Sequence, residues 1–286
     1  MKLTAFLCAL VLCLSLAACS NGETPETTVS TTTAPTTIAT TAPADPTVKT
    51  VYVHTSITSA SDTMDARTEY IYDENNCLTE IIQYSGTSQT QRYAVVCDEN
   101  GNFIEWNTTV GALELSIRYA YDDQGKQLGS SQYHNGELMS QTLYTWANGV
   151  HTEILAVMPA QNRETRTQYT YNSQGIRVRE DHLVNNVLQR YGIYTADEEG
   201  RVASISFYQA DGSIHSTVSY SYDGLTETQT TTNPYGQIQQ KVITTYDEHG
   251  NLLEKQTYDQ ENNLISTVTH TWMAITVPVD SPRASA

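Results

Sequence analysis

The sequence predicts an all-β protein. We expect an antiparallel meander of β-hairpin repeats, each about 25 residues long, with roughly eighteen strands curled or rolled into a barrel-like or spiral sheet. Three observations lead to this fold class. Aromatic residues recur at a nearly constant interval, turns rich in Asp, Asn and Gly follow them, and apolar positions alternate with polar ones between the turns.

The first observation is the spacing of the aromatic residue that closes a strand before each turn. The series is Tyr72, Cys97, Tyr121, Trp146, Tyr171, Ala196, Tyr222, Tyr246 and Trp272. Only Cys97 and Ala196 break the aromatic pattern, and successive members lie 24 to 26 residues apart. Because aromatic residues make up only 9% of the chain, this regularity indicates an internal repeat.

A second series divides each repeat into two strands. Tyr84, Tyr133, Tyr208 and Tyr258 precede further turns, at intervals close to two or three repeat lengths. Each repeat therefore contains two strands and two turns, which is a β-hairpin.

The turns after the strand-closing residues share a composition. Most of them have Asp or Asn at the first position and Gly at the fourth, and in the first copy Asn76 replaces the Gly. The pairs are Asp73 with Asn76, Asp98 with Gly101, Asp122 with Gly125, Asn172 with Gly175, Asp197 with Gly200, and Asp247 with Gly250. This pattern suits a type I turn followed by a left-handed residue. The Asp and Asn oxygens could alternatively serve as calcium ligands, but the turns lack the dense ligand spacing of known calcium-binding loops.

Between the turns, the side chains alternate with a period of two. Val218, Tyr220 and Tyr222 share one face of a strand, whereas Ser219 and Ser221 point to the other. We therefore expect one packed face and one wet face. Open sheets rarely exceed about ten strands, so a sheet of this length must roll up, spiral or split into two layers. The run from Met273 to Val279 is expected to close it, with Pro278 ending the last strand.

The N-terminus predicts a signal peptide over residues 1–18. Lys2 provides a charged start, and the apolar stretch from Leu3 to Leu16 is too short to span a bilayer comfortably. Leu16-Ala17-Ala18-Cys19 resembles the lipobox of bacterial lipoproteins, in which the cysteine becomes the lipidated N-terminus. The resemblance implies a lipid anchor at Cys19 on the extracytoplasmic face of the cell membrane. The alternative is an ordinary signal peptide followed by a chance cysteine.

A stalk and a short tail are expected on either side of the repeats. Residues 19–48 contain mainly Ser, Thr, Pro, Ala and Glu after Cys19, and such a segment buries too little surface to offset its ordering entropy. We predict a disordered stalk there, a repeat domain over 49–277 and a C-terminal tail over 278–286.

The repeats resemble the YD repeats of the RHS family. The best copies are Tyr119-x-Tyr121-Asp122-x-x-Gly125 and Tyr246-Asp247-x-x-Gly250-x-Leu252, and the resemblance covers about residues 68–272. In long RHS proteins such repeats form a spiralling shell around a toxin, and related animal repeats act in cell-surface adhesion. The repeats are too few to enclose a domain and no toxin domain is expected after Trp272, so we do not expect an encapsulating role. The resemblance implies the architecture and an extracellular setting.

Two cysteines remain after Cys8 and Cys13 leave with the signal peptide and Cys19 is lipidated. The hairpin that contains Cys77 and Cys97 turns near residues 85–90, which places the two cysteines opposite each other. A cross-strand disulfide is the favoured interpretation, since an extracytoplasmic protein permits it. The alternative is two unbonded thiols on a half-buried strand.

Catalytic and metal chemistry have little support. The seven His residues never pair at metal-ligand spacing, and zinc-protease, serine-hydrolase and phosphate-loop motifs are absent. Acidic residues could assemble a glycosidase-type pair in space, but most lie in predicted turns, where solvated side chains are the simpler interpretation. We expect no enzyme activity, no cofactor and no metal site.

The net charge of −17 excludes nucleic acid as a partner. The anchor, the stalk and the 19 Tyr residues predict a monomeric, surface-displayed, non-enzymatic binding or adhesion module, whose ligand is an extracellular glycan, wall polymer or protein. The alternatives are a structural cell-envelope lipoprotein without a specific ligand, a polymer hydrolase, and a transmembrane barrel, whose membrane insertion a lipid anchor would make redundant.

Overall fold

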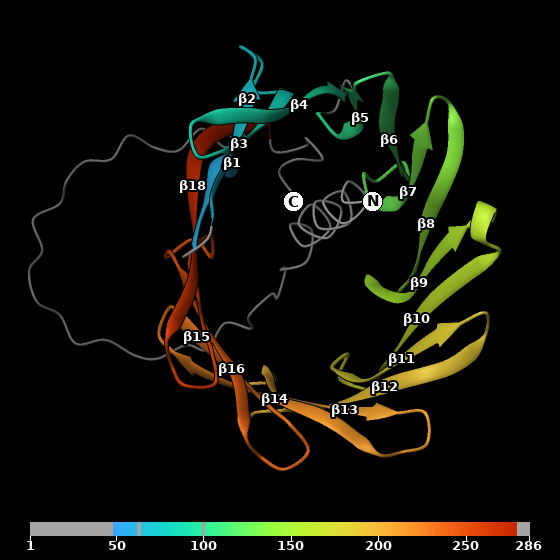
Figure 1. The fold of residues 1–286 in the computed structure, drawn as a ribbon, viewed down its shortest axis with the longest axis vertical. Helices are drawn as coiled ribbons and strands as arrows, with labels where there is room; N and C mark the ends of the chain where they lie inside the picture. Colours follow the sequence, from blue (N-terminus) through green and yellow to red (C-terminus); the bar gives the residue numbers. More distant parts are fainter. Residues whose placement is uncertain (1–47, 62–63, 99–100, 279–286) are drawn as a thin grey trace, which may run out of the picture.

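The structure, a computed structural model, describes residues 48–61, 64–98 and 101–278. Within them eighteen antiparallel strands form one closed barrel, which confirms the predicted fold class (Figure 1). The predicted signal peptide, the lipidation site Cys19, most of the stalk and the tail beyond Pro278 lie outside the described residues.

The strands are seven to fifteen residues long. The first nine are β1 Val48–Ser61, β2 Met64–Tyr72, β3 Leu78–Ser85, β4 Ser88–Cys97, β5 Phe103–Val110, β6 Leu113–Tyr121, β7 Gln127–His134, β8 Glu137–Ala147 and β9 Val150–Met158. A single turn of 3₁₀ helix, η1 Pro159–Gln161, follows β9. The remaining strands are β10 Arg163–Tyr171, β11 Arg177–Val184, β12 Val187–Ala196, β13 Val202–Gln209, β14 Ile214–Asp223, β15 Thr226–Thr232, β16 Ile238–Tyr246, β17 Leu252–Tyr258 and β18 Leu264–Pro278.

Strand pairing follows the chain, with one exception that closes the barrel. Each strand pairs with the strands that precede and follow it in sequence, as in a meander. In addition β1, drawn in blue, lies beside β18, drawn in red (Figure 1). The two strands share thirteen residue pairs, from Val48 with Pro278 to Ser61 with Ser266. The described part of the predicted closing run, Met273 to Pro278, therefore does close the sheet against β1.

One face of the sheet carries most of the buried side chains, and the other carries a smaller cluster of Ile275 and Val277 with Val51 and Val53. Ile81 pairs with Tyr93, and Val95, Trp106 and Ile117 pair in turn across β4 to β6, which forms one apolar cluster. Among the described residues, however, no large side chain is less than 2% exposed. A barrel of this many strands is too wide for its side chains to meet at the axis. The ladder and cross-strand packing therefore hold the fold together in place of a central core.

The two ends of the barrel differ in composition. The connections after even-numbered strands contain ten acidic residues among the described positions: Asp73, Glu74, Asp98, Asp122, Asp123, Asp197, Glu198, Glu199, Asp247 and Glu248. We call this the acidic end. The connections after odd-numbered strands, at the opposite end, contain only three in the part that the structure describes: Asp211, Asp259 and Glu261. Since β1 starts and β18 finishes at the acidic end, Val48 and Pro278 both lie there.

Candidate functional site

The strand-closing aromatic residues tie neighbouring strands together. Each of six donates a side-chain hydrogen bond to a backbone carbonyl 18 to 20 residues upstream. The pairs are Tyr72 with His54 (2.8 Å), Tyr121 with Phe103 (2.8 Å), Trp146 with Gln127 (2.9 Å), Tyr171 with His151 (2.7 Å), Tyr222 with Val202 (2.9 Å) and Trp272 with Leu252 (2.7 Å). For Tyr246 the tie is made by the backbone, whose N–H donates to Leu225 at 2.9 Å. The hydroxyl and indole groups of the six side-chain donors therefore have a structural role.

In five of the five-residue turns at the acidic end, the side chain of the first residue accepts the same two backbone hydrogen bonds. Oδ1 of Asp122 accepts backbone N–H groups from Gln124 at 3.0 Å and Lys126 at 2.8 Å. The same pair of bonds recurs at Asp73, Asn172, Asp197 and Asp247. Gly125, Gly175 and Gly250 adopt φ of 78°, 79° and 81°, a region that side chains rarely tolerate. The turn chemistry accounts for these residues without a bound ion.

A polar network on the packed face is the arrangement that most resembles a catalytic group. The Glu180 carboxylate, which is buried, lies 3.0 Å from His182 Nε2 and accepts the Tyr194 hydroxyl at 2.6 Å. His182 Nδ1 lies 3.2 Å from Thr167 Oγ1. Burial alone would raise the pKa of Glu180, but the bonds from His182 and Tyr194 lower it.

The side chains of this network hydrogen-bond to one another. Both Glu180 oxygens are engaged, and Arg177 lies 4.2 Å above the Tyr169 ring. Burial, followed by the bond to Glu180, raises the pKa of Tyr194. These bonds fix the Glu180, His182 and Tyr194 side chains on a half-buried face and occupy both Glu180 oxygens, whereas the buried Nε of Arg177 has no hydrogen-bond partner among the described residues.

A second titratable cluster lies where the barrel closes. His54 Nε2 on β1 and His270 Nδ1 on β18 are 3.1 Å apart. The His54 ring is centred 3.6 Å from Trp272 and 5.7 Å from Tyr70. Sequence spacing could not reveal this pair, because 216 residues separate its members. Predicting the pair from the sequence would have required the register between the first and last strands.

The register of the cysteine hairpin agrees with the sequence argument. Glu80 pairs with Ala94, and continuing that register would place Cys77 opposite Cys97. Both are thiols in the described chain. The Cys97 thiol lies 3.5 Å from the Leu78 carbonyl, and Cys77 precedes β3 in the turn that Asp73 caps. The disulfide therefore stays a prediction, which intact mass before and after reduction tests.

The end opposite the acidic end exposes apolar side chains around its rim. Tyr235 is 88% exposed and Val187 is 61% exposed. The rim set comprises Leu138, Val187, Ile214, Tyr235, Ile238, Leu264 and Ile265, all in or within two residues of connections that follow odd-numbered strands. We call this the apolar end. The sequence analysis missed it, because a period of two assigns residues to faces and not to ends. The acidic end also exposes apolar side chains, namely Val48, Ile71, Val96, Leu128, Leu225 and Leu253, but there they lie among ten acidic residues.

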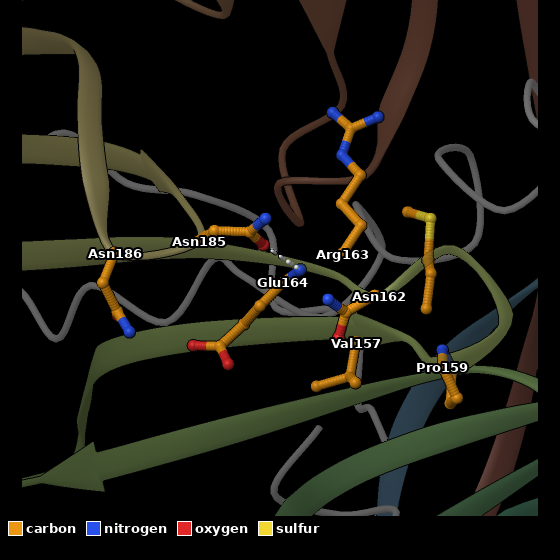
Figure 2. Close-up of a pocket in the computed structure, with 8 residues that line it drawn as sticks. Val157, Pro159, Asn162, Arg163, Glu164, Asn185 and Asn186 are labelled. Carbon is orange, nitrogen blue, oxygen red and sulfur yellow. Dashed lines mark hydrogen bonds between the residues drawn. The ribbon is translucent and has the colours of Figure 1, made fainter.

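A hollow of about 360 Å³ lies at the apolar end, where η1 replaces the usual tight turn (Figure 2). Its lining residues are Val157, Met158, Pro159, Asn162, Arg163, Glu164, Asn185 and Asn186. Asn185 Oδ1 accepts the Glu164 N–H at 2.8 Å, shown dashed in Figure 2, and Arg166 binds the Glu164 carboxylate. The hollow thus combines an aliphatic part with amides and an exposed guanidinium from Arg163.

The described residues contain neither a cluster of metal-ligand side chains nor a helix suited to span a membrane. No three His, Cys, Asp or Glu side chains in residues 48–61, 64–98 and 101–278 gather closely enough to hold a metal ion. Across the same ranges, no helix has the length and apolar character needed to cross a membrane.

Comparisons with known proteins return distant structural likenesses. No protein-family model and no curated protein sequence matches the chain. The crystal structure of TcdB2-TccC3-Cdc42 is similar over 74% of this chain and 15% of that chain, at 14% identity and a TM-score of 0.40. A porin-like protein from Bacteroides vulgatus is similar over 76% of this chain and 97% of its own, at 12% identity and a TM-score of 0.34.

The Photorhabdus luminescens Tc holotoxin pore is similar over 68% of this chain and 12% of that chain, at 14% identity and a TM-score of 0.33. This chain thus spans a small fraction of the toxin chains that it matches. Likenesses at these TM-scores carry no argument about function.

Proposed function

We propose that the protein is a lipid-anchored, surface-displayed binding or adhesion module without enzyme activity, and that it engages an extracellular glycan or protein ligand through its apolar end. One observation carries this proposal. Both described chain ends, Val48 and Pro278, lie at the acidic end. A stalk that enters at Val48 therefore attaches to the acidic end and leaves the apolar end pointing away from the anchor.

The composition of the apolar end supports a docking role. Isolated exposed apolar residues are ordinary, and both ends of the barrel expose several. The apolar end differs because it carries the two most exposed, Tyr235 and Val187, with few acidic residues around them. Tyr235 stands at the tip of the β15–β16 connection, and the hollow beside Arg163 adds polar groups to the same end. Aromatic rings and an arginine are the side chains that most often anchor ligands at such surfaces.

The tyrosine-rich face, which the sequence analysis favoured as the ligand platform, is a weaker candidate. Tyr220 and Tyr222 are half-buried, and the Tyr222 hydroxyl is engaged by the Val202 carbonyl. Burial raises the pKa of Tyr222 to about 12. These rings pack within the sheet, so the binding role moves from the face to the end of the barrel.

Charged side chains on both faces favour an anchored module over a membrane-inserted one. Glu80 with Arg92 and Glu105 with Arg118 form ion pairs on one face. Glu180, Glu227 and Lys255 lie on the other face, which is the face that carries the larger apolar cluster. Charge within the hydrocarbon of a bilayer is costly, so both faces suit water better than lipid.

A structural cell-envelope role is the second candidate. It is favoured by the repeated ties and capped turns, which use most polar groups of the YD-type motif internally. Such a protein would need no ligand. The two candidates differ in whether the apolar end has a partner.

A binding experiment at the apolar end separates these candidates. The protein from residue 20 onward is applied to arrays of glycans, wall polymers and matrix proteins. We expect Val187→Ser, Ile214→Ser and Tyr235→Ser together to weaken the observed binding by at least about tenfold, because each removes a rim contact. Cys19→Ala should abolish labelling of the full chain by palmitate.

The matched control changes exposed apolar residues at the acidic end. Leu128 is 41% exposed, close to the 40% of Ile214, and Val96 and Leu253 are 43% and 37% exposed. Leu128→Ser, Val96→Ser and Leu253→Ser together should leave binding unchanged. Equal losses in both triple variants would contradict an apolar-end site, and silence of the wild type across every array would favour the structural role.

A further inference from the structure

The barrel depends on one strand pair for its closure. β1 contacts β2 through six residue pairs, from Ser56 with Glu69 to Ser61 with Met64, and β18 through thirteen. All other neighbours in the sheet are consecutive in the chain. We call the β1–β18 pair the seam. If the seam opens, the barrel becomes an open sheet with two unpaired edges.

Two histidines meet across this seam. Nε2 of His54 and Nδ1 of His270 are 3.1 Å apart, and the ring centroids are 5.3 Å apart. This is hydrogen-bond distance, so one ring donates N–H and the other accepts, which requires at least one neutral imidazole. The bond lies beside the register shift between His54 and Ser56, where the ladder itself is interrupted.

The surroundings of His54 come from both neighbouring strands. On β18, Trp272 packs against the ring at a centroid distance of 3.6 Å. On β2, Tyr70 lies at 5.7 Å, and the Tyr72 hydroxyl binds the His54 carbonyl at 2.8 Å. On β17, Lys255 adds positive charge near His270. None of these four groups is a carboxylate, so none offers an ion pair to a protonated imidazole.

Burial and charge both favour the neutral pair. Burial, assisted by His270, lowers the pKa of His54 from 6.5 to about 4. Burial, followed by the Lys255 charge, also lowers the pKa of His270. Protonating both rings would place two like charges at contact distance inside the seam, with loss of their mutual bond.

We propose that His54 and His270 make the seam acid-sensitive: the neutral pair holds β1 against β18 at neutral pH, and protonation releases the two strands so that the barrel opens there. This inference is independent of the proposed binding function. It assigns a conformational role to a side-chain pair that no repeat motif contains.

The direction of the pH effect follows from linkage. The pKa values of both histidines are lower in the closed barrel than in a hydrated strand, so opening takes up protons. Closure is therefore fully favourable above about pH 6.5 and weakens as the pH falls toward the closed-state pKa of His54, about 4. Below that value the effect levels off.

Hydrogen–deuterium exchange of the mature protein tests the proposal. Protection factors, which correct for the intrinsic pH dependence of exchange, are compared at pH 7.0 and pH 4.5. We expect protection in β1 (48–61) and β18 (264–278) to fall by at least about tenfold at the lower pH, while β5 to β14 stay protected. A uniform fall over all strands, or no fall at the seam, would overturn the proposal.

Variants separate the histidines from other acid-titrating groups. In H54Q with H270Q, amide side chains keep a hydrogen bond but cannot be protonated, so seam protection should be the same at both pH values. H215Q removes an exposed histidine on β14 and should retain the wild-type response. Circular dichroism checks that the double variant is folded. If it does not fold, the seam-localised response of the wild type against H215Q still decides the matter.

Discussion

The two ends of the barrel differ in the length of their turns and in the residues that the turns contain. At the acidic end, most turns have five residues, and an Asp or Asn caps them by accepting two backbone N–H groups. At the apolar end, several turns have two residues, such as Asn135-Gly136 and Asn185-Asn186, whose φ values are all positive. Two-residue turns also occur at the acidic end, at Asn148-Gly149 and Gly224-Leu225, so the ends differ in the proportion of capped five-residue turns.

The separation is incomplete in an instructive way. The last two connections at the apolar end, after β15 and β17, are five-residue turns capped by Asn233 and Asp259. Hydrogen bonds from Asn263 lower the pKa of the Asp259 carboxyl, as expected for a capping residue. Yet Tyr235 occupies the tip of the first of these turns. The backbone N–H groups of the turn require an acceptor side chain at the capping position, whereas the exposed tip position is free to vary.

Removing a cap should give the largest effect on stability. Asp247→Ala at the acidic end leaves the N–H groups of His249 and Asn251 without their acceptor, so the free energy of unfolding should fall by about 2 kcal/mol, because each lost hydrogen bond contributes about 1 kcal/mol. Urea unfolding followed by circular dichroism measures it. The control is Asp247→Asn, which keeps the acceptor as Asn172 does in its own turn. An equal loss for Ala and Asn would show that charge, and not the cap, matters there.

Removing a tyrosine hydroxyl should give a smaller effect that also differs between the ends. Tyr222→Phe deprives the Val202 carbonyl of its donor, and we expect a loss of roughly 0.5 to 1.5 kcal/mol in the free energy of unfolding. Tyr235→Phe, at the exposed apolar tip, should change stability by less than about 0.5 kcal/mol. Similar losses for the two variants in the same urea titration would contradict the structural role of the strand-closing hydroxyls.

Charge reversal should give the smallest effect. Glu248→Lys relieves repulsion among the acidic residues of its end, and the midpoint of thermal unfolding should rise slightly at low salt. Glu261→Lys, at the apolar end where acids are sparse, should change it less. Differential scanning calorimetry at two salt concentrations measures both. A gain for Glu248→Lys that survives high salt would not be electrostatic.

The local elements could be predicted from the sequence, whereas the long-range contacts could not. Strand number and hairpin register follow from period, turn residues and alternation, as the pairing of Glu80 with Ala94 shows. The requirement for rolling follows from strand number. The contact between His54 and His270 depends on which strands meet after one full circuit, which no local pattern encodes. The apolar end was missed because its residues come from several separate connections, and each connection is too short to show a distinctive pattern.

The pairing of every strand with its chain neighbours has a consequence for how the protein reaches its structure. Each hairpin can form from residues close in sequence, and the growing sheet can extend by adding one hairpin at a time, as in a linear repeat protein. Among the described strands, only those of the seam pair residues more than two hundred positions apart. Because closing so long a loop has a large entropic cost, we expect the seam to form after the hairpins. The ring size is therefore fixed by how many hairpins the gene supplies, and a chain lengthened by one repeat would keep every local pairing and close at a larger circumference.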